Sequence, residues 1–164
     1  MSKYTCILLF FLTTMAFYSC SKSPNYPNEP FIRFEKLEQF TLGSSDSLVI
    51  HLYFEDGDGD LGEDRETNAE PNFFVDLYRF QNGEFVLYEL ELPLNGTFPP
   101  MVDKSYRGPI DGILKKGLPL IPHSRHPGRY RMDIRIRDRA MNYSNTVTSP
   151  EFVIGQENND DFPL

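Results

Sequence analysis

A period of two in the side chains of two segments constrains the fold of this chain more than any other feature. In 48–55 the even positions are Leu, Ile, Leu and Phe and the odd positions are Val, His, Tyr and Glu, and in 129–137 apolar residues alternate with four arginines and an aspartate. Side chains on a β-strand point to opposite faces in turn, so each segment has one strongly apolar face. Both segments are therefore predicted to be strands that bury one face in a core.

Further strands and turns extend this pattern along the chain. Gln81-Asn82-Gly83-Glu84 separates two apolar runs, and Asn-Gly in this position predicts a β-hairpin. Pro150 lies inside the last apolar run, which favours an edge or bulged strand there. The remaining strands are predicted at 73–80, 85–92 and 146–154, with weaker candidates at 32–40 and 110–115. No segment predicts a helix, and about seven short strands separated by turns are typical of a sandwich.

Two motifs near the C-terminus support this fold. Gly128-Arg-Tyr130 begins one predicted strand, and Asp138-Arg-Ala-Met-Asn-Tyr-Ser144 follows it. Together they resemble the last two strands of bacterial immunoglobulin-like and fibronectin type III-like domains, which carry Gly-x-Tyr and then an Asp-x-Ala-Gly-Asn-x-Ser turn. The resemblance implies an all-β, immunoglobulin-like antiparallel β-sandwich, with Tyr130 in a tyrosine corner. Met141 replaces the usual glycine, so the positive φ of the turn is expected at Asn142.

The N-terminus predicts export. Residues 5–18 form an apolar stretch that follows one positive charge and is too short to span a bilayer comfortably. The junction Phe17-Tyr18-Ser19-Cys20 resembles the lipobox of bacterial lipoproteins, in which the cysteine is acylated and becomes the mature N-terminus. Phe17 and Tyr18 are bulkier than the strict pattern, a looseness similar to that of Bacteroidota lipoproteins. Ordinary cleavage after Ala16 stays an alternative.

The cysteine content agrees with a lipid anchor. The chain has two cysteines, and Cys6 leaves with the signal peptide, so Cys20 is the lone cysteine of the processed chain. Stable anchoring requires two or more acyl chains. The expected organisation is a signal peptide at 1–19, lipidated Cys20 with a proline-rich tether to 30, a domain at 31–155 and an acidic tail at 156–164. This layout is similar to that of uncharacterised Bacteroidota lipoproteins, which implies a cell-envelope location, with the outer membrane favoured.

An acidic loop is the one segment with evident chemistry. Residues 55–64 place aspartates at alternate positions with glycines between them, like the first half of a calcium loop. The EF-hand pattern fails at Leu61, which should be glycine, and at Thr67, which should be glutamate. The candidate Ca²⁺ ligands are Asp56, Asp58, Asp60 and Asp64. The alternative is a plain, solvated acidic turn.

The function predicted from these features is that of a non-enzymatic binding or structural module. No catalytic motif was found, and a net charge of −8 argues against a nucleic-acid partner. A protein or glycan partner in the envelope is expected, with Phe98, Tyr106, Arg131 and Arg135 as candidate binding residues. The arginine stripe has a second interpretation as the solvated face of a strand. The alternative function is a polysaccharide-active enzyme or an accessory subunit of a glycan-utilisation system.

Overall fold

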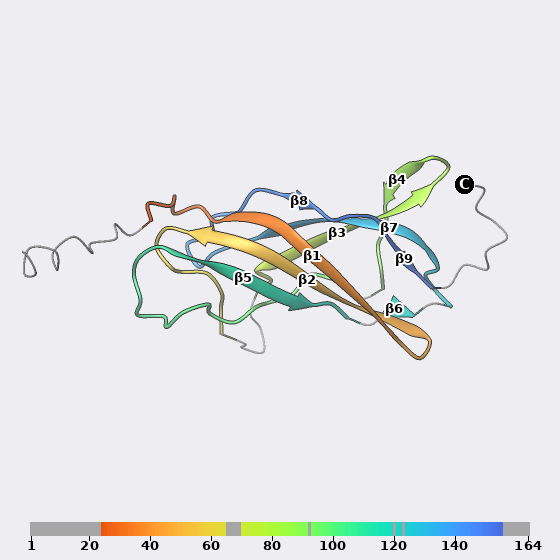
Figure 1. The fold of residues 1–164 in the computed structure, drawn as a ribbon, viewed down its shortest axis with the longest axis horizontal. Helices are drawn as coiled ribbons and strands as arrows, with labels where there is room; N and C mark the ends of the chain where they lie inside the picture. Colours follow the sequence, from red (N-terminus) through yellow and green to blue (C-terminus); the bar gives the residue numbers. More distant parts are fainter. Residues whose placement is uncertain (1–23, 65–69, 92, 120, 123, 156–164) are drawn as a thin grey trace, which may run out of the picture.

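The computed structural model describes residues 24–64, 70–91, 93–119, 121–122 and 124–155. Within these ranges the chain forms two antiparallel sheets packed face to face as a sandwich, and none of the described residues is helical (Figure 1). The predicted all-β sandwich is therefore confirmed. None of the described segments forms a helix of the length and apolarity needed to cross a membrane.

The front sheet in Figure 1 is built on its central strand, β2 (Ser45–Asp56). A tight hairpin joins β2 to β1 (Phe31–Leu42), with Leu42 opposite Ser45. The other edge of β2 pairs with β5 (Ile110–Gly117) and, near its start, with the short β6 (Ile121–Pro122). The alternation predicted for 48–55 is confirmed, because buried and partly exposed residues alternate along the whole of β2.

The back sheet is built on β3 (Phe73–Gln81) and β7 (Gly128–Ile136). The predicted hairpin joins β3 to β4 (Glu84–Leu87), and Asn82 and Gly83 have φ angles of 52° and 90°. Two positive φ angles are the requirement of a type I′ turn, which explains the choice of Asn-Gly. On its other edge β7 pairs with β8 (Val147–Thr148) and β9 (Phe152–Ile154).

The strands differ from prediction mainly at the edges of the sheets. Nine strands are present in the described residues, and three of them are only two or three residues long. The segment predicted as one strand at 146–154 is interrupted around Pro150, which cannot donate a ladder hydrogen bond. The strand predicted at 85–92 ends at Leu87.

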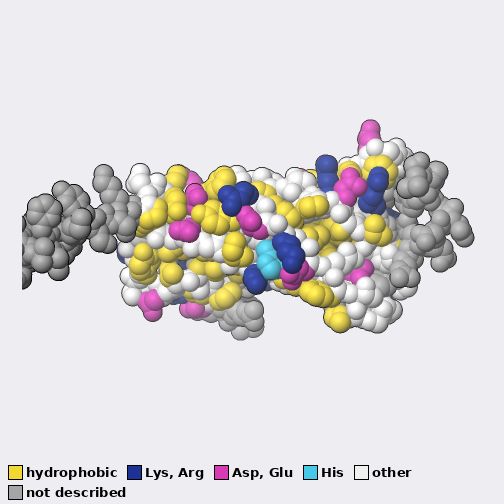
Figure 2. Space-filling model, viewed as in Figure 1, with side chains coloured by type: hydrophobic (Ala, Val, Ile, Leu, Met, Phe, Trp, Pro, Cys, Tyr) yellow, Lys and Arg dark blue, Asp and Glu magenta, His cyan; other side chains and the backbone are white. Residues whose placement is uncertain are grey.

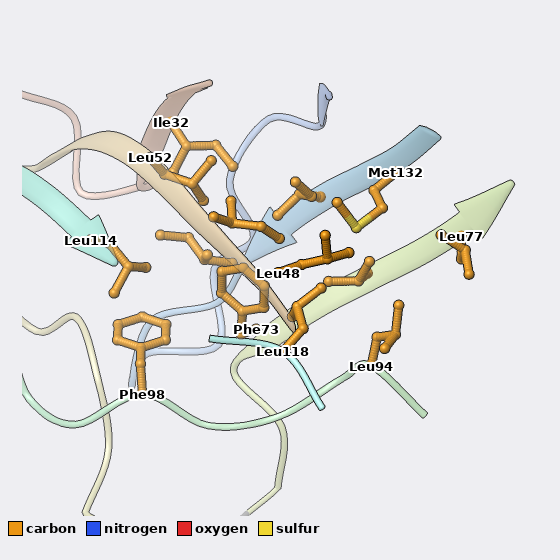
Figure 3. Packing of buried hydrophobic residues seen from close by; sticks show 14 of the residues in the cluster. Ile32, Leu48, Leu52, Phe73, Leu77, Leu94, Phe98, Leu114, Leu118 and Met132 are labelled. Atoms are coloured by element: carbon orange, nitrogen blue, oxygen red, sulfur yellow. The ribbon is translucent and has the colours of Figure 1, made fainter. Parts of the chain in front are cut away.

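The core lies between the sheets and is continuous from end to end (Figure 3). Tyr130 is fully buried, and its hydroxyl donates a hydrogen bond to the His126 carbonyl at 3.0 Å. This contact is the tyrosine corner that the sequence predicted. The largest fully buried side chains come from both sheets and from the loops: Ile32, Leu48, Ile50, Leu52, Leu61, Phe73, Phe98, Ile121, Tyr130, Met132, Ile134 and Ile136.

The turn after β7 corrects one prediction. Met141, rather than Asn142, adopts the left-handed conformation, with a φ of 72°. Asn142 is instead held by Asp138, whose carboxylate accepts hydrogen bonds from the Asn142 backbone and side-chain amides. The turn therefore keeps the shape of a glycine-containing turn although a side chain occupies the strained position.

Candidate metal centre

Two aspartates end the core-facing rows of two strands in different sheets. Asp56 follows Leu48, Ile50, Leu52 and Phe54 on the buried face of β2 and is fully buried. Asp138 lies two residues beyond Ile136, in the same phase as the buried residues of β7, and is 4% exposed. Because each aspartate continues a row that points between the sheets, both carboxylates lie at the same end of the sandwich.

The loop after β2 turns back and adds Asp60. The Asp60 backbone amide donates to Asp56 Oδ2 at 3.0 Å, and Asp60 Oδ2 accepts from the Ala140 amide at 3.0 Å. The second bond joins residues 80 positions apart. Gly59 makes the reversal possible, because its φ of 71° is one that other L-residues rarely adopt.

Carboxylate oxygens of Asp56, Asp60 and Asp138 lie within 4.8 Å of one another. The Oδ1 atoms of Asp56, Asp58 and Asp60 are buried and have no hydrogen-bond partner. In Asp56 and Asp60 the second oxygen, Oδ2, accepts a backbone amide, so each of these side chains is held by one oxygen and leaves the other free. Unpartnered buried oxygens are costly unless a cation satisfies them.

The electrostatics of the cluster favour neutralisation of its negative charge. Burial raises the pKa of Asp56 to about 6, with smaller contributions from the charges of Asp58 and Asp60. Burial also raises the pKa of Asp60, and the negative charge of Asp138 raises it further. None of the ion pairs among the described residues involves Asp56, Asp60 or Asp138. Arg139 is a nearby positive charge that lowers the pKa of Asp60, but burial and the other carboxylates outweigh it, and a bound cation would offset them.

Two other loops enclose this end of the sandwich. The Met101 amide donates to the Leu61 carbonyl at 3.1 Å, and the Gly108 amide donates to the Asp58 carbonyl at 3.3 Å. Gly62 packs so closely that an added Cβ would lie 2.1 Å from the Pro99 carbonyl oxygen. The acidic loop therefore lies between 98–108 and the turn after β7, and its free oxygens face the protein.

The donor set fits a hard divalent cation. It consists of carboxylate oxygens, with no sulfur or imidazole, which is the chemistry of calcium and magnesium sites. The described residues thus contain a partly buried acidic triad that could hold a metal.

The structure distributes the predicted metal ligands between this centre and the surface. Asp56 and Asp60 belong to the triad. Asp58 lies in the same loop, and its Oδ1 atom is buried and has no hydrogen-bond partner. Asp64 is not part of the triad: its exposed carboxylate pairs with Lys104 at 2.5 Å. Sequence reasoning missed Asp138 as a ligand, although its place in the core-facing row of β7 could have revealed it.

The predicted binding residues lie in different parts of the structure. Phe98, a candidate binding residue, is not on the surface: it is 2% exposed and packs in the core near Leu114 (Figure 3). Its segment is irregular but folds against β3, where Gly96 bridges Phe73. Tyr106 is 42% exposed and its ring lies against Gly59 of the acidic loop. Arg131 and Arg135 lie on the outer face of the back sheet.

Cys20, the signal peptide and the acidic tail lie outside the described residues.

By its fold and site the chain is an all-β, two-sheet domain with an acidic cluster between the ends of its sheets. No family model, curated protein or solved structure matched it in comparison.

Proposed function

We propose that this protein is a lipid-anchored module of a bacterial cell envelope, of the Bacteroidota lipoprotein type, whose sandwich is stabilised by a bound calcium ion. The lipid on Cys20 would hold it at a membrane, the outer membrane being favoured. The head would act as a binding or structural module rather than as an enzyme. The observation that carries the calcium part is the set of buried, unpartnered Oδ1 atoms of Asp56, Asp58 and Asp60.

Calcium is favoured over magnesium by the geometry of the donors. Magnesium requires near-ideal octahedral geometry and usually keeps several waters, whereas calcium accepts six to eight oxygens in flexible arrangements. The candidate oxygens are buried, which leaves little room for a retained water shell. Their burial also supports a structural ion, because a substrate would have no access to them. Extracellular calcium modules bind with a Kd of about 0.1 to 1 mM.

Support for the lipid anchor comes from the sequence. Cys20 follows a short apolar stretch and a small residue, and polar, proline-rich sequence follows it. A lone cysteine at this junction is explained by acylation, and two or more acyl chains would make the attachment stable.

Thermal melting of the metal-stripped protein tests the calcium site. Calcium at about 100 times its Kd stabilises a protein by about 2.7 kcal/mol, which corresponds to a rise in Tm of about 5 to 10 °C for a domain of this size. We expect this rise in the wild type, with heat on calorimetric titration, and its loss in Asp56→Asn. Asp64→Asn is the matched control, because it removes a carboxylate of the same loop that pairs with Lys104. An unchanged Tm at about 10 to 100 mM calcium, which is 100 times the expected Kd, would contradict the proposal.

Metabolic labelling with palmitate tests the anchor. The wild type and Cys6→Ala should incorporate label and fractionate with membranes, while Cys20→Ala should do neither. Mass spectrometry of the mature protein should find an acylated N-terminus at Cys20. An unmodified N-terminus at another residue would contradict the anchor and leave the calcium result unaffected.

A further inference from the structure

The outer face of the back sheet carries arginines packed on aromatic rings. On β7, Arg131 and Arg135 point outward, and in the strand register they lie opposite Tyr78 and Phe74 of β3. Cation–π contacts connect the two strands across this surface, which we call the arginine–aromatic face. Its members are Phe74, Asp76, Tyr78, Phe80, Phe85, Arg129, Arg131, Asp133, Arg135, Arg137 and Tyr143.

The rings hold the two central guanidinium groups in position. Arg131 lies 4.6 Å from the centroid of the Phe85 ring and 5.5 Å from that of Tyr78. Arg135 lies 5.0 Å from the Tyr143 centroid and 5.5 Å from that of Phe74. A guanidinium stacked on a ring keeps its edge free, and this edge can bind a carboxylate through two parallel hydrogen bonds.

These two arginines differ from the neighbouring arginines of the same face because they have no acidic partner. Arg129 pairs with Glu151 and Arg137 pairs with Glu70, whereas no ion pair or side-chain hydrogen bond joins Arg131 or Arg135 to any described residue.

The front sheet shows the opposite arrangement. Its outer face in Figure 2 mixes basic and acidic side chains, and there Arg33 pairs with Glu35 and Lys36 pairs with Glu38. Lys115 of β5 also has no ion pair, but among the arginines of the described strands only Arg131 and Arg135 stack on rings without an ion pair or a side-chain hydrogen bond.

Two aspartates lie between the unpaired arginines and restrict the class of ligand. Asp76 and Asp133 are directly opposite each other in the strand register, and Asp133 accepts a hydrogen bond from Thr148 at 2.6 Å. Two carboxylates at the centre of the face repel a polymer with an anion at every position, as does the net charge of −8. They accept hydrogen bonds from hydroxyl groups, so the face offers cations at two places and hydroxyl acceptors between them.

We propose that the arginine–aromatic face binds an acidic polysaccharide, with uronate carboxylates on Arg131 and Arg135 and sugar hydroxyls on Asp76 and Asp133. The two arginines are four residues apart on one strand, which separates the anionic groups they would bind by about 13 Å. A hydroxylated polymer with widely spaced carboxylates has both kinds of group. This inference rests on the proposed function, because it names the partner class of the envelope module.

Calorimetric titration of the calcium-loaded full-length protein tests the face, with hyaluronan oligosaccharides of defined length, in which each uronate alternates with a neutral sugar. We expect saturable binding that weakens with added salt and that falls about tenfold or more in the double variant Arg131→Ala, Arg135→Ala. Arg33→Ala is the matched control, because Arg33 also stacks on a ring, that of Tyr53, but lies on the front sheet. It should bind as the wild type does. Circular dichroism and the calcium-induced rise in Tm establish that each variant is folded.

Three outcomes would overturn the inference. These are no binding of the hyaluronan oligosaccharides by the wild type at low salt, equal binding of neutral dextran, and tighter binding of poly-glutamate than of the hyaluronan oligosaccharides. A variant that keeps its calcium response but loses binding separates this face from the metal centre. If calcium has no effect on the wild type, the comparison of the arginine variants still stands, because it does not depend on the metal.

Discussion

Asp56 and Asp138 are the last members of two core-facing rows, one in each sheet, and their carboxylate oxygens approach within 4.8 Å. Apart from Asp46, which begins the β2 row, the residues before these acids are apolar, and both acids are buried because they continue the same core-facing rows. The strand pattern that builds the core thus also brings charge together at its end. Nothing in the local sequence of either strand requires this meeting, which depends on how the two sheets are stacked.

The stability of the metal-free domain should fall as pH rises. The pKa of Asp56 is about 6 in the folded protein, against an ordinary value of 3.8, so between these values the folded state binds more protons than the unfolded state. The contribution of Asp56 is therefore most favourable at low pH and is lost as pH rises through 6. In EDTA, the free energy of unfolding should decrease by about 1 to 1.5 kcal/mol from pH 5 to pH 7.5.

Urea unfolding at the two pH values, in the wild type and in Asp56→Asn, checks this dependence. In Asp56→Asn the free energy of unfolding should no longer decrease between the two pH values. If the variant has the same pH profile as the wild type, Asp56 is not the cause of the decrease. With calcium present the trend should reverse. Calcium binds the ionised carboxylates, so its affinity should decrease as pH falls below about 6.

Gly62→Ala should destabilise the domain much more than Gly83→Ala. Both glycines have a φ near 90°, but a Cβ at Gly62 would lie 2.1 Å from the Pro99 carbonyl oxygen, whereas a Cβ at Gly83 would meet nothing within 4 Å. Gly83→Ala should therefore cost only the conformational strain, about 1 to 2 kcal/mol. Gly62→Ala should cost this strain and the displacement of the 98–101 segment. Equal losses of Tm in the two variants would show that the close approach at Gly62 is not maintained in solution.

Tyr130→Phe should cost about 1 kcal/mol, because it removes the donor from the part-buried His126 carbonyl. Tyr106→Phe offers a comparison, since the Tyr106 hydroxyl also donates to a carbonyl, that of Pro109, but on an exposed side chain. Water can replace that donor, and the cost should be below about 0.5 kcal/mol. Denaturant titration of both variants measures the difference, and a neutral Tyr130→Phe would remove the tyrosine corner from the stabilising contacts.

Met141→Gly should stabilise the domain by about 0.5 to 1 kcal/mol. Met141 holds a φ of 72° on an exposed side chain, so glycine removes backbone strain at the cost of some chain entropy and little packing. Ala140→Gly in the same turn has no positive φ to relieve and should destabilise instead. Guanidinium unfolding distinguishes the two, and stabilisation by both or by neither would contradict the strain at Met141.

Much of the candidate centre could be predicted from one loop and the rest could not. Asp56, Asp58 and Asp60 were predicted together because alternate acids with glycines between them are a local pattern. Asp138 was not predicted, because its turn meets Asp60 through a hydrogen bond between residues 80 positions apart in the sequence. Asp64, which was predicted with them, lies outside the triad and pairs with Lys104, a residue of a loop whose path the sequence does not reveal.

The sequence alone determined the long strands at the centre of each sheet, the direction of their buried faces and the Asn82-Gly83 turn, but not the short edge strands. These depend on backbone sterics and on the period of two, which act over a few residues. Only the tertiary structure decided that Phe98 is buried, that Arg131 and Arg135 stack on rings without acidic partners, and that Asp56 meets Asp138. Each of these depends on the packing of one sheet or loop against another, and short-range propensities carry no information about which distant segments come into contact.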